Sequence, residues 1–407
     1  MRYILTSLLA FYFTFSLAQF PALELPAQKN LSEPDVAISL KKENNMVISS
    51  STGEMFYSDD SGKSWNTSSL GISADGVTVV SDNKGVFYAF ATKGEEVVGF
   101  KSKDSGASWE EEGRQRFSGL INYQVVNNIN NGSLGFTCVV KSEEDGCKNT
   151  VYYSDLNGGK KWGKIAKIAE VSCEEQTITG SALGFSPDDR MYVAYLSTQT
   201  GILMDRSYDK GKTWLYKDIS VADYFAGDSL LMPGLNEHQT EPQLILDVTS
   251  TQYRGGLYLT WDDKRPTAGT NIYFISSRNN GDYWNTIGQV NEASDGQHFM
   301  PVMAQDHEIG VIYILYYQTE SKESNATDVI IAYSIDGGAS FVNKKLTSES
   351  FQIDQALRSG LSIKAHNGNI LASWTKHVNG KATLITSMIT QKQLVPELKI
   401  PSGKRKK

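Results

Sequence analysis

The chain has few cysteines and histidines, the residues that form disulfides and bind metals. Its 407 residues include only three cysteines and five histidines, with no zinc-ligand spacing and no disulfide framework. The formal net charge of −7 is opposite to the basic balance of a nucleic-acid-binding protein. Beyond the N-terminus, no apolar run is long enough to span a membrane. These features exclude a zinc finger, a disulfide scaffold and a multi-span membrane protein, and no nucleic acid is expected as a partner.

Residues 1–18 have the pattern of a secretory signal peptide. A positive start at Arg2 precedes the apolar residues 3–17, and Ser16 and Ala18 place small side chains before a cleavage site at Gln19. A membrane anchor is the less favoured alternative, because the apolar stretch is shorter than the ~20 residues of a span. We therefore expect a secreted, periplasmic or cell-surface protein with no membrane span after cleavage.

The mature chain is expected to form one domain over residues 19–400, followed by a basic, disordered tail at 401–407. In an oxidising compartment, Cys147 and Cys173 could form a disulfide. Cys138 lies in an apolar run and is expected to be a buried free thiol. No phosphate loop, nucleotide fingerprint or metal-ligand spacing occurs, so neither a metal nor another cofactor is expected.

A short pattern recurs six times, and its first copy runs from Ser58 to Trp65 as Ser-Asp-Asp-Ser-Gly-Lys-Ser-Trp. The other copies begin at Ser102, Ser154, Ser207, Ser277 and Ser334. The Asp or Asn at the third place can accept hydrogen bonds from the amides of its own turn, and the glycine can adopt a positive φ. The final Trp or Phe can pack between sheets. The pattern predicts a repeated β-hairpin, which is a folding device and not a catalytic motif.

These copies resemble the Asp-box, or bacterial neuraminidase repeat, of the sialidase superfamily. The resemblance implies an all-β chain folded as a β-propeller, in which each box joins the third and fourth strands of a blade. Trp65 and Phe341 are 276 residues apart over five steps, or about 55 residues per blade. Three further strand-like runs follow the last box. Seven blades are therefore favoured and six are the alternative, and either residues 21–25 or residues 395–400 could supply the final strand.

The resemblance does not extend to the sialidase site. Sialidases grip their substrate with three arginines, the first in a motif ahead of the first box, but no arginine lies between Arg2 and Arg114 here. We therefore expect no typical exo-sialidase activity, because lysine does not reproduce a bidentate arginine clamp. The start Glu33-Pro34-Asp35 instead resembles exported sialidase-like repeat proteins of unsettled activity.

The resemblance places a ligand site at the channel mouth opposite the boxes, near first-strand starts and second-to-third-strand loops. Carboxylates there suit acid–base work on a glycan, aromatic rings suit a sugar face, and arginine suits an anionic group. The candidate catalytic residues are Asp35, Glu241, Asp262, Asp263 and Glu320. The candidate substrate-binding residues are His238, Trp261, Arg265, His298, Tyr316, Tyr317, Arg358, Trp374 and His377. As the alternative, the tryptophans pack between blades, the histidines are structural, and Asp35 and Glu241 bond only to backbone.

The favoured function is a divergent glycoside hydrolase or another polysaccharide-active enzyme acting on extracellular glycans. A lyase that pairs His298 with Tyr316 is a variant of this hypothesis. The alternative is a non-catalytic propeller that binds glycan or protein at the mouth. A third hypothesis is an assembly propeller whose rim contacts another exported protein.

Overall fold

The computed structural model describes most of the chain. The described residues are 20–26, 30–141, 149–157, 161–169, 177–227, 230–232, 234–250, 252–266, 269–353, 360–378 and 380–396. The predicted signal peptide, the Cys147–Cys173 pair, Arg358 and the basic tail lie outside the described residues.

The described residues are almost entirely β-structure. The strands of the first half are β1 (Leu23–Glu24), β2 (Asp35–Ile38), β3 (Met46–Ser49), β4 (Glu54–Ser58), β5 (Asn66–Ser69), β6 (Gly76–Ser81), β7 (Phe87–Lys93), β8 (Glu96–Ser102), β9 (Glu110–Arg116), β10 (Leu120–Asn127), β11 (Leu134–Lys141), β12 (Asn149–Asn157), β13 (Lys161–Trp162), β14 (Ala166–Lys167), β15 (Ile178–Phe185), β16 (Met191–Ser197) and β17 (Gly201–Ser207). The remaining elements are β18 (Ile219–Ala222), β19 (Leu230–Met232), β20 (Leu235–His238), β21 (Gln243–Leu246), β22 (Leu257–Lys264), β23 (Thr270–Ser277), β24 (Gly288–Gln289), β25 (His298–Gln305), β26 (Ile312–Thr319), β27 (Ala326–Ser334), β28 (Val342–Lys345), β29 (Phe351–Gln352), β30 (Leu361–His366), β31 (Asn369–Val378), β32 (Lys381–Thr390) and α1 (Gln391–Leu394).

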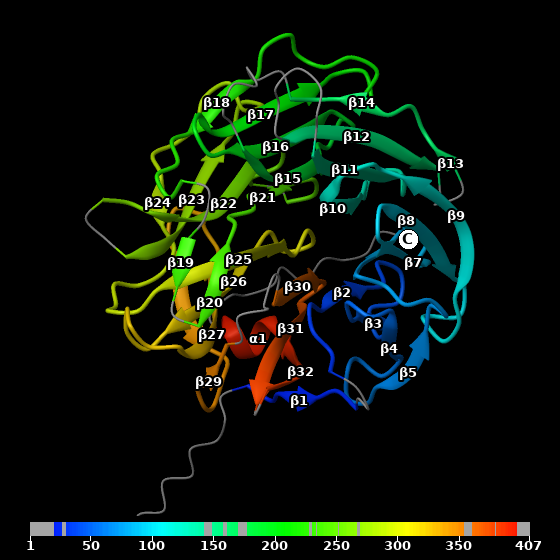
Figure 1. Cartoon of the computed structure of the whole chain (residues 1–407), viewed down its shortest axis with the longest axis vertical. Coiled ribbons are helices and arrows are strands. Elements are labelled where there is room, and N and C mark those ends of the chain that lie inside the picture. The colour runs from blue at the N-terminus through cyan, green and yellow to red at the C-terminus, as the bar shows by residue number, and fades with distance from the viewer. Residues whose placement is uncertain are drawn as a thin grey trace, which may run out of the picture.

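Consecutive strands pair antiparallel into small meanders. Four sheets have the strand orders β2-β3-β4-β5, β6-β7-β8-β9, β15-β16-β17-β18 and β21-β22-β23-β24. A fifth follows the order β10-β11-β12-β13, and β14 also pairs with β12. One larger sheet contains β25 to β28 and then β30 to β32, with β29 pairing between them. Figure 1 shows these sheets arranged around a central axis, with β2, β10, β15, β21, β25 and β30 nearest to it.

The N-terminal strand completes the last group of strands. β1 pairs antiparallel with β32, so that Leu23 lies opposite Thr386. Ser387 Oγ donates a hydrogen bond of 2.7 Å to the Pro21 carbonyl, and the Phe20 ring is buried in the adjoining core. Of the two segments predicted for this position, the N-terminal one therefore occupies it. In the other segment, residues 395 and 396 follow α1 (391–394) and form no strand, and residues 397–400 lie outside the described part of the chain.

The repeated segments form turns held by their own side chains. Asp60 accepts hydrogen bonds from the Lys63 and Ser64 amides, each at 3.0 Å, and from Ser64 Oγ at 2.6 Å. The bonds from the Ser64 side chain and amide lower the pKa of the Asp60 carboxyl to about 2. Asp209 repeats these three contacts with Lys212 and Thr213. These carboxylates are engaged inside their own turns, which agrees with a structural role.

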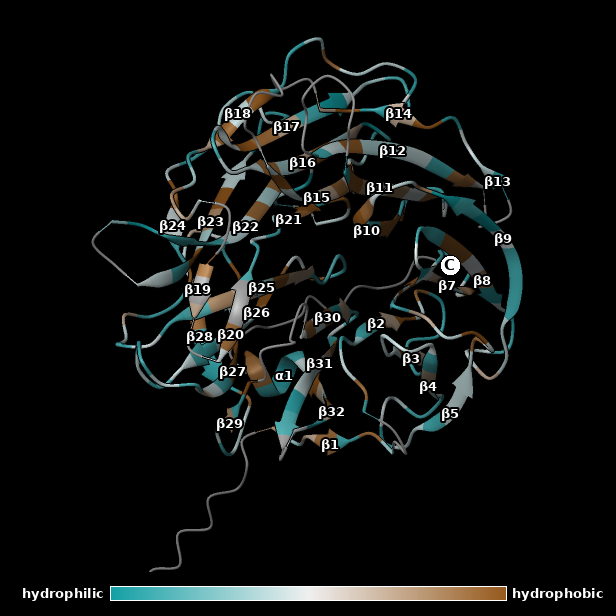
Figure 2. Ribbon diagram, in the orientation of Figure 1, coloured by the Kyte–Doolittle hydropathy of each residue, from teal (hydrophilic) through white to brown (hydrophobic). Residues whose placement is uncertain are grey.

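Apolar side chains gather between neighbouring sheets, and Figure 2 shows brown residues on the strands of the interior. Trp109 packs between the first two sheets and donates a hydrogen bond of 3.2 Å to Ser68 Oγ. Gly106, in the same turn, has φ +98°. A Cβ there would lie 2.7 Å from Val47 Cγ2, so only glycine fits this approach between sheets.

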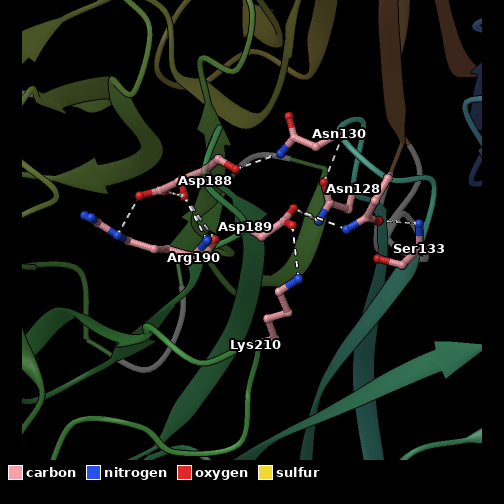
Figure 3. Close-up of polar contacts among 9 residues, drawn as sticks. Asn128, Asn130, Ser133, Asp188, Asp189, Arg190 and Lys210 are labelled. Atoms are coloured by element: carbon pink, nitrogen blue, oxygen red, sulfur yellow. Dashed lines mark hydrogen bonds and ion pairs between the residues drawn. The ribbon is translucent and has the colours of Figure 1, made fainter.

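Polar turns also join neighbouring sheets, as Figure 3 shows for the β10–β11 and β15–β16 turns. Asp189 Oδ1 accepts hydrogen bonds from Asn128 at 2.9 Å and Asn131 at 3.2 Å. Lys210 of a repeated turn lies 3.4 Å from the other carboxylate oxygen. This network joins two sheets at the end of the channel that carries the repeated turns.

Candidate functional site

The innermost strands enclose a central cavity of about 950 Å3. Residues of β2, β6, β10, β15, β21, β25 and β30 line it. Because strands alternate in direction within each meander, first strands start at the end opposite the repeated turns, which join third and fourth strands. Four carboxylates line the cavity at or just before such starts: Glu33, Asp35, Asp75 and Glu241. This end is the acidic mouth.

Glu241 is one of the two exposed carboxylates among these four, with Asp75. It lies two residues before β21, and its side chain is exposed to the channel. Asn122 Nδ2 donates a 3.1 Å hydrogen bond to Glu241 Oε1, and the same amide donates to the Thr179 carbonyl at 2.6 Å. Desolvation by the surrounding protein, together with the charge of Asp262, raises the pKa of the Glu241 carboxyl. The Asn122 hydrogen bond and the charge of His238 act against that rise. Glu241 is therefore suited to hold a proton in the channel.

Glycine makes room for Glu241. A Cβ on Gly180 would lie 2.8 Å from Glu241 Cγ and 2.9 Å from Glu241 Cβ. Such distances are well inside the contact distance of two carbon atoms. The third residue of β15 must therefore be glycine for Glu241 to keep its place.

His238 and Asp262 form a buried pair behind the mouth. His238 Nε2 lies 2.5 Å from Asp262 Oδ2, and neither side chain is more than 6% exposed. Asp262 also accepts hydrogen bonds from Thr240 Oγ1 at 2.6 Å and from the Met300 amide at 2.8 Å. His238 ends β20, which pairs antiparallel with β19 in a two-stranded hairpin. The pair thus attaches this hairpin to β22 and β25.

The two members of the pair stabilise each other's charge. Burial disfavours the imidazolium of His238, but the charge of Asp262 and the contact with it outweigh burial and raise the pKa of His238. Burial likewise acts to raise the pKa of Asp262, yet His238 and the hydrogen bonds from Thr240 and Met300 lower it. Both shifts favour the ion pair near neutral pH.

Asp35 lines the same cavity but is held by three strands. Its Oδ1 accepts hydrogen bonds from the Val36 amide at 2.9 Å and Ser362 Oγ at 2.7 Å, and its Oδ2 accepts one of 2.9 Å from the Val79 amide. Burial raises the pKa of Asp35, while Lys364 and the three hydrogen bonds oppose that rise. This carboxylate therefore joins β2, β6 and β30 as well as facing the channel.

Asp263 points the other way from Asp262, because successive strand residues face opposite sides. Asp263 Oδ1 accepts a 3.0 Å hydrogen bond from the Phe225 amide, and Oδ2 lies 3.7 Å from Arg265 Nε. The Arg265 guanidinium lies over Tyr273 at 4.2 Å from the ring centroid. Neither Asp263 nor Arg265 lines the cavity.

The large aromatic candidates belong to the core between sheets. Four of them are at most 2% exposed: Trp261, Trp374, Tyr316 and Tyr317. Tyr316 Oη donates to Asn343 Oδ1 at 2.8 Å, and Tyr317 Oη donates to the Gly360 carbonyl at 2.9 Å. None of the four lines the cavity, so a ligand there would not reach these rings. For Trp261 and Trp374, burial agrees with the packing alternative stated from the sequence.

The other candidates also lie away from the channel. His298 is buried, with Nε2 3.0 Å from Ser294 Oγ, and burial lowers its pKa to about 4. Glu320 is exposed just after β26, and His377 is half-buried near the end of β31. Neither of these two lines the cavity. The structure thus brings Glu241, His238 and Asp262 together and places Asp35 on the same cavity.

Sequence reasoning placed Glu33 at the mouth beside Asp35 but missed two other polar residues there, Asp75 and Asn122. The signal that selected Asp35 and Glu241, a polar residue at the start of an innermost strand, also fits these positions. No cluster of three or more His, Cys, Asp or Glu side chains that could hold a metal occurs within the described ranges. In the part of the chain that the structure describes, no helix is long and apolar enough to cross a membrane.

No protein-family model matches the chain, and no curated protein matches it. Solved structures do match across nearly the whole length. An ulvan lyase bound to a sulfated glucuronyl-rhamnose saccharide shares 11% identity over 91% of this chain and 96% of its own, with a TM-score of 0.54. The α-L-arabinofuranosidase of Fusarium graminearum, in complex with an iminosugar inhibitor, shares 10% identity over 92% of this chain and 98% of its own, with a TM-score of 0.51. YCF48 from Cyanidioschyzon merolae shares 11% identity over 90% of this chain and 98% of its own, with a TM-score of 0.50.

These likenesses, together with the meanders around a central channel, define the class of the fold as a β-propeller. At such low identities they establish the fold alone. The all-β propeller predicted from the repeats is therefore confirmed at the level of the fold.

Proposed function

We propose that the chain is a glycan-active propeller of the glycoside-hydrolase type, with its active site at the acidic mouth. The observation that carries this proposal is the position of Glu241. Its carboxyl faces a cavity of about 950 Å3, has a raised pKa, and lies beside the buried His238–Asp262 pair. A carboxyl whose pKa is raised is the kind of group that can protonate a glycosidic oxygen.

Asp35 is the second carboxylate of the proposed mechanism. Burial raises the pKa of Asp35 as desolvation raises that of Glu241, but three hydrogen bonds and Lys364 oppose the rise at Asp35, whereas the Asn122 hydrogen bond and the charge of His238 oppose it at Glu241. In hydrolysis, Glu241 gives its proton to the leaving oxygen as the glycosidic bond breaks. Asp35 accepts a proton from the water that adds to the anomeric carbon. Paired carboxyls in these two roles are the general arrangement of glycosidases.

The test is product analysis with the purified mature chain on a panel of oligosaccharides. The wild-type chain should release new reducing ends from at least one glycan. Glu241→Gln should lower kcat/KM by roughly 10²–10⁴-fold, the usual contribution of general acid–base catalysis. The matched control is Glu320→Gln, which alters an exposed carboxylate that does not line the cavity and should leave kcat/KM unchanged. Full activity in Glu241→Gln would disprove the assigned role.

A binding module without turnover is the second candidate. It is favoured by the exposed Ile121, which lines the cavity, and by Phe225, which is 50% exposed. YCF48, which shares the fold, has been solved bound to a D1 peptide. Binding without new reducing ends in the product assay would support a glycan- or protein-binding mouth, with an exported protein as the partner in the second case.

We further propose that the ring has seven blades and that the repeated turns are Asp boxes. Five meanders are separate sheets, and the largest sheet supplies two further groups, β25–β28 and β30–β32 with β1. The last group lies beside the first, because Ser362 Oγ in β30 donates a hydrogen bond of 2.7 Å to Asp35 Oδ1 in β2. We also propose that the chain is exported after removal of residues 1–18. The mass of the exported chain tests this, because cleavage before Gln19 removes a defined mass.

A further inference from the structure

The charged side chains that line the cavity are mostly of one sign. Among the described residues, the carboxylates of Glu33, Asp35, Asp75 and Glu241 outnumber the lysine and arginine side chains there, of which Lys364 is the single example. His307 also lines the cavity, but burial lowers its pKa to about 4, so it is neutral at pH 7. With Glu241 protonated in its assigned role, three carboxylates still face one lysine, so a ligand in this cavity meets an excess of negative charge.

This charge is concentrated at the entrance. All four carboxylates lie at or just before the starts of innermost strands. Ser362 is level with Asp35, since the two side chains are bonded at 2.7 Å, and Lys364 lies two residues further along β30. His366 ends the same strand and lines the far part of the cavity. A glycan that enters from the mouth meets the carboxylates before it meets the lysine.

The nearby cations are already engaged or lie outside the cavity. His238 is paired with the buried Asp262. Arg265 lies beside Asp263 and over the Tyr273 ring. Lys93 ends β7 and Lys264 ends β22, and both side chains are exposed. Neither of them lines the cavity. None of these groups is placed to pair with an anionic sugar inside the channel.

We infer that the mouth selects neutral or amino-bearing glycans and rejects those that carry carboxylate or sulfate groups. This inference rests on the proposed function. A cleft lined by one sign of charge between low-dielectric walls strengthens its own field, so an anionic sugar is repelled as it enters. Among the described residues, Lys364 is the single lysine or arginine on the cavity wall that could pair with such a sugar, and the sugar would lose hydration beside the carboxylates before it reached Lys364. Because β-elimination proceeds beside a carboxylate on the sugar ring, the same charge favours hydrolysis over a lyase reaction.

The experiment measures the affinity of the mature chain for four hexamers by calorimetric titration. The neutral probes are arabinohexaose and N-acetylated chitohexaose, the cationic probe is fully deacetylated chitosan hexamer, and the anionic probe is oligogalacturonate hexamer. At low salt, at least one neutral or cationic probe should bind at least about tenfold more tightly than oligogalacturonate, a ratio equal to about 1.4 kcal/mol. High salt should reduce this ratio, because ions screen the field.

A charge variant separates the mouth from the net charge of the protein. Glu33→Gln with Asp75→Asn should bring the affinity for oligogalacturonate closer to that for the preferred probe. Asp59→Asn with Asp188→Asn changes the net charge equally at the turns of the opposite end and should leave the ratio unchanged. Tightest binding of oligogalacturonate, or an unchanged ratio in the mouth variant, would overturn the charge inference alone. Binding of none of the four probes would overturn the proposed function as well.

Discussion

Replacing Asp262 by asparagine tests whether the buried ion pair holds the hairpin of β19 and β20 against the propeller. The substitution keeps the side-chain volume but removes the charge beside His238. Asp262 accepts three contacts, from His238, Thr240 and the Met300 amide, and an asparagine can offer only one of its two terminal atoms as an acceptor. His238 is then left buried next to a neutral amide.

The expected loss of stability is large. Breaking a buried pair by removing one partner costs about 3–5 kcal/mol. The adjacent Asp263→Asn is the matched control, because Asp263 is also fully buried but accepts one hydrogen bond and lies 3.7 Å from its cation. Its replacement should cost about 1–3 kcal/mol, the range for loss of a buried hydrogen-bond partner. Urea unfolding of both variants, followed by tryptophan fluorescence, measures the difference.

The pH dependence gives a second readout with a fixed sign. The pKa of His238 is raised above its ordinary 6.5, so its contribution is fully present below pH 6.5 and is lost as the pH rises through the folded-state pKa. The pKa of Asp262 is lowered below 3.8, so its contribution is present above that value and is lost as the pH falls through the folded-state pKa. The stability gap between the wild-type chain and Asp262→Asn should therefore be widest between about pH 4 and 6.5.

A double-mutant cycle with His238→Gln isolates the pair itself. If the reasoning is right, the two single losses are not additive, because each removes the same contact. A loss below about 1 kcal/mol in Asp262→Asn, as expected for an exposed pair, would refute the argument. A gap that stays constant from pH 4 to 8 would refute the assignment of the ion pair.

Two further changes test the strands around the site. Deleting residues 20–25 should destabilise the chain and promote association, because β1 would no longer cover the edge of β32. Deleting residues 1–19 should change neither property, and size-exclusion chromatography with thermal unfolding compares the two deletions. Gly180→Ala should lower kcat/KM, because the new methyl group collides with Glu241. Gly94→Ala is the control for loss of a glycine, since a Cβ there meets nothing within 4 Å, and its φ of +60° should give it only a modest loss of stability.

Local features of the molecule could be predicted from the sequence alone. The repeated turns are held by contacts over four residues or fewer, such as Asp60 with Ser64, so their form depends on residues that are adjacent in the chain. The positions of Asp35 and Glu241 on the cavity follow what the family resemblance implied, because both lie at or just before the start of an innermost strand. The propeller follows from repetition, since each sheet must bury its apolar faces against its neighbours.

Contacts between distant segments required the tertiary structure. The choice between Asp262 and Asp263 depends on which neighbour each side of β22 faces, and adjacent identical residues carry no information about that choice. His238 reaches Asp262 only because the β19–β20 hairpin packs over the next sheets. β1 joins β32 across almost the whole chain, and the burial of Trp261 and Trp374 depends on the packing of whole sheets. Local hydrogen bonds form within a few residues and can be predicted from the order of those residues, whereas burial and charge pairing depend on distant segments that only the packing of the sheets brings together.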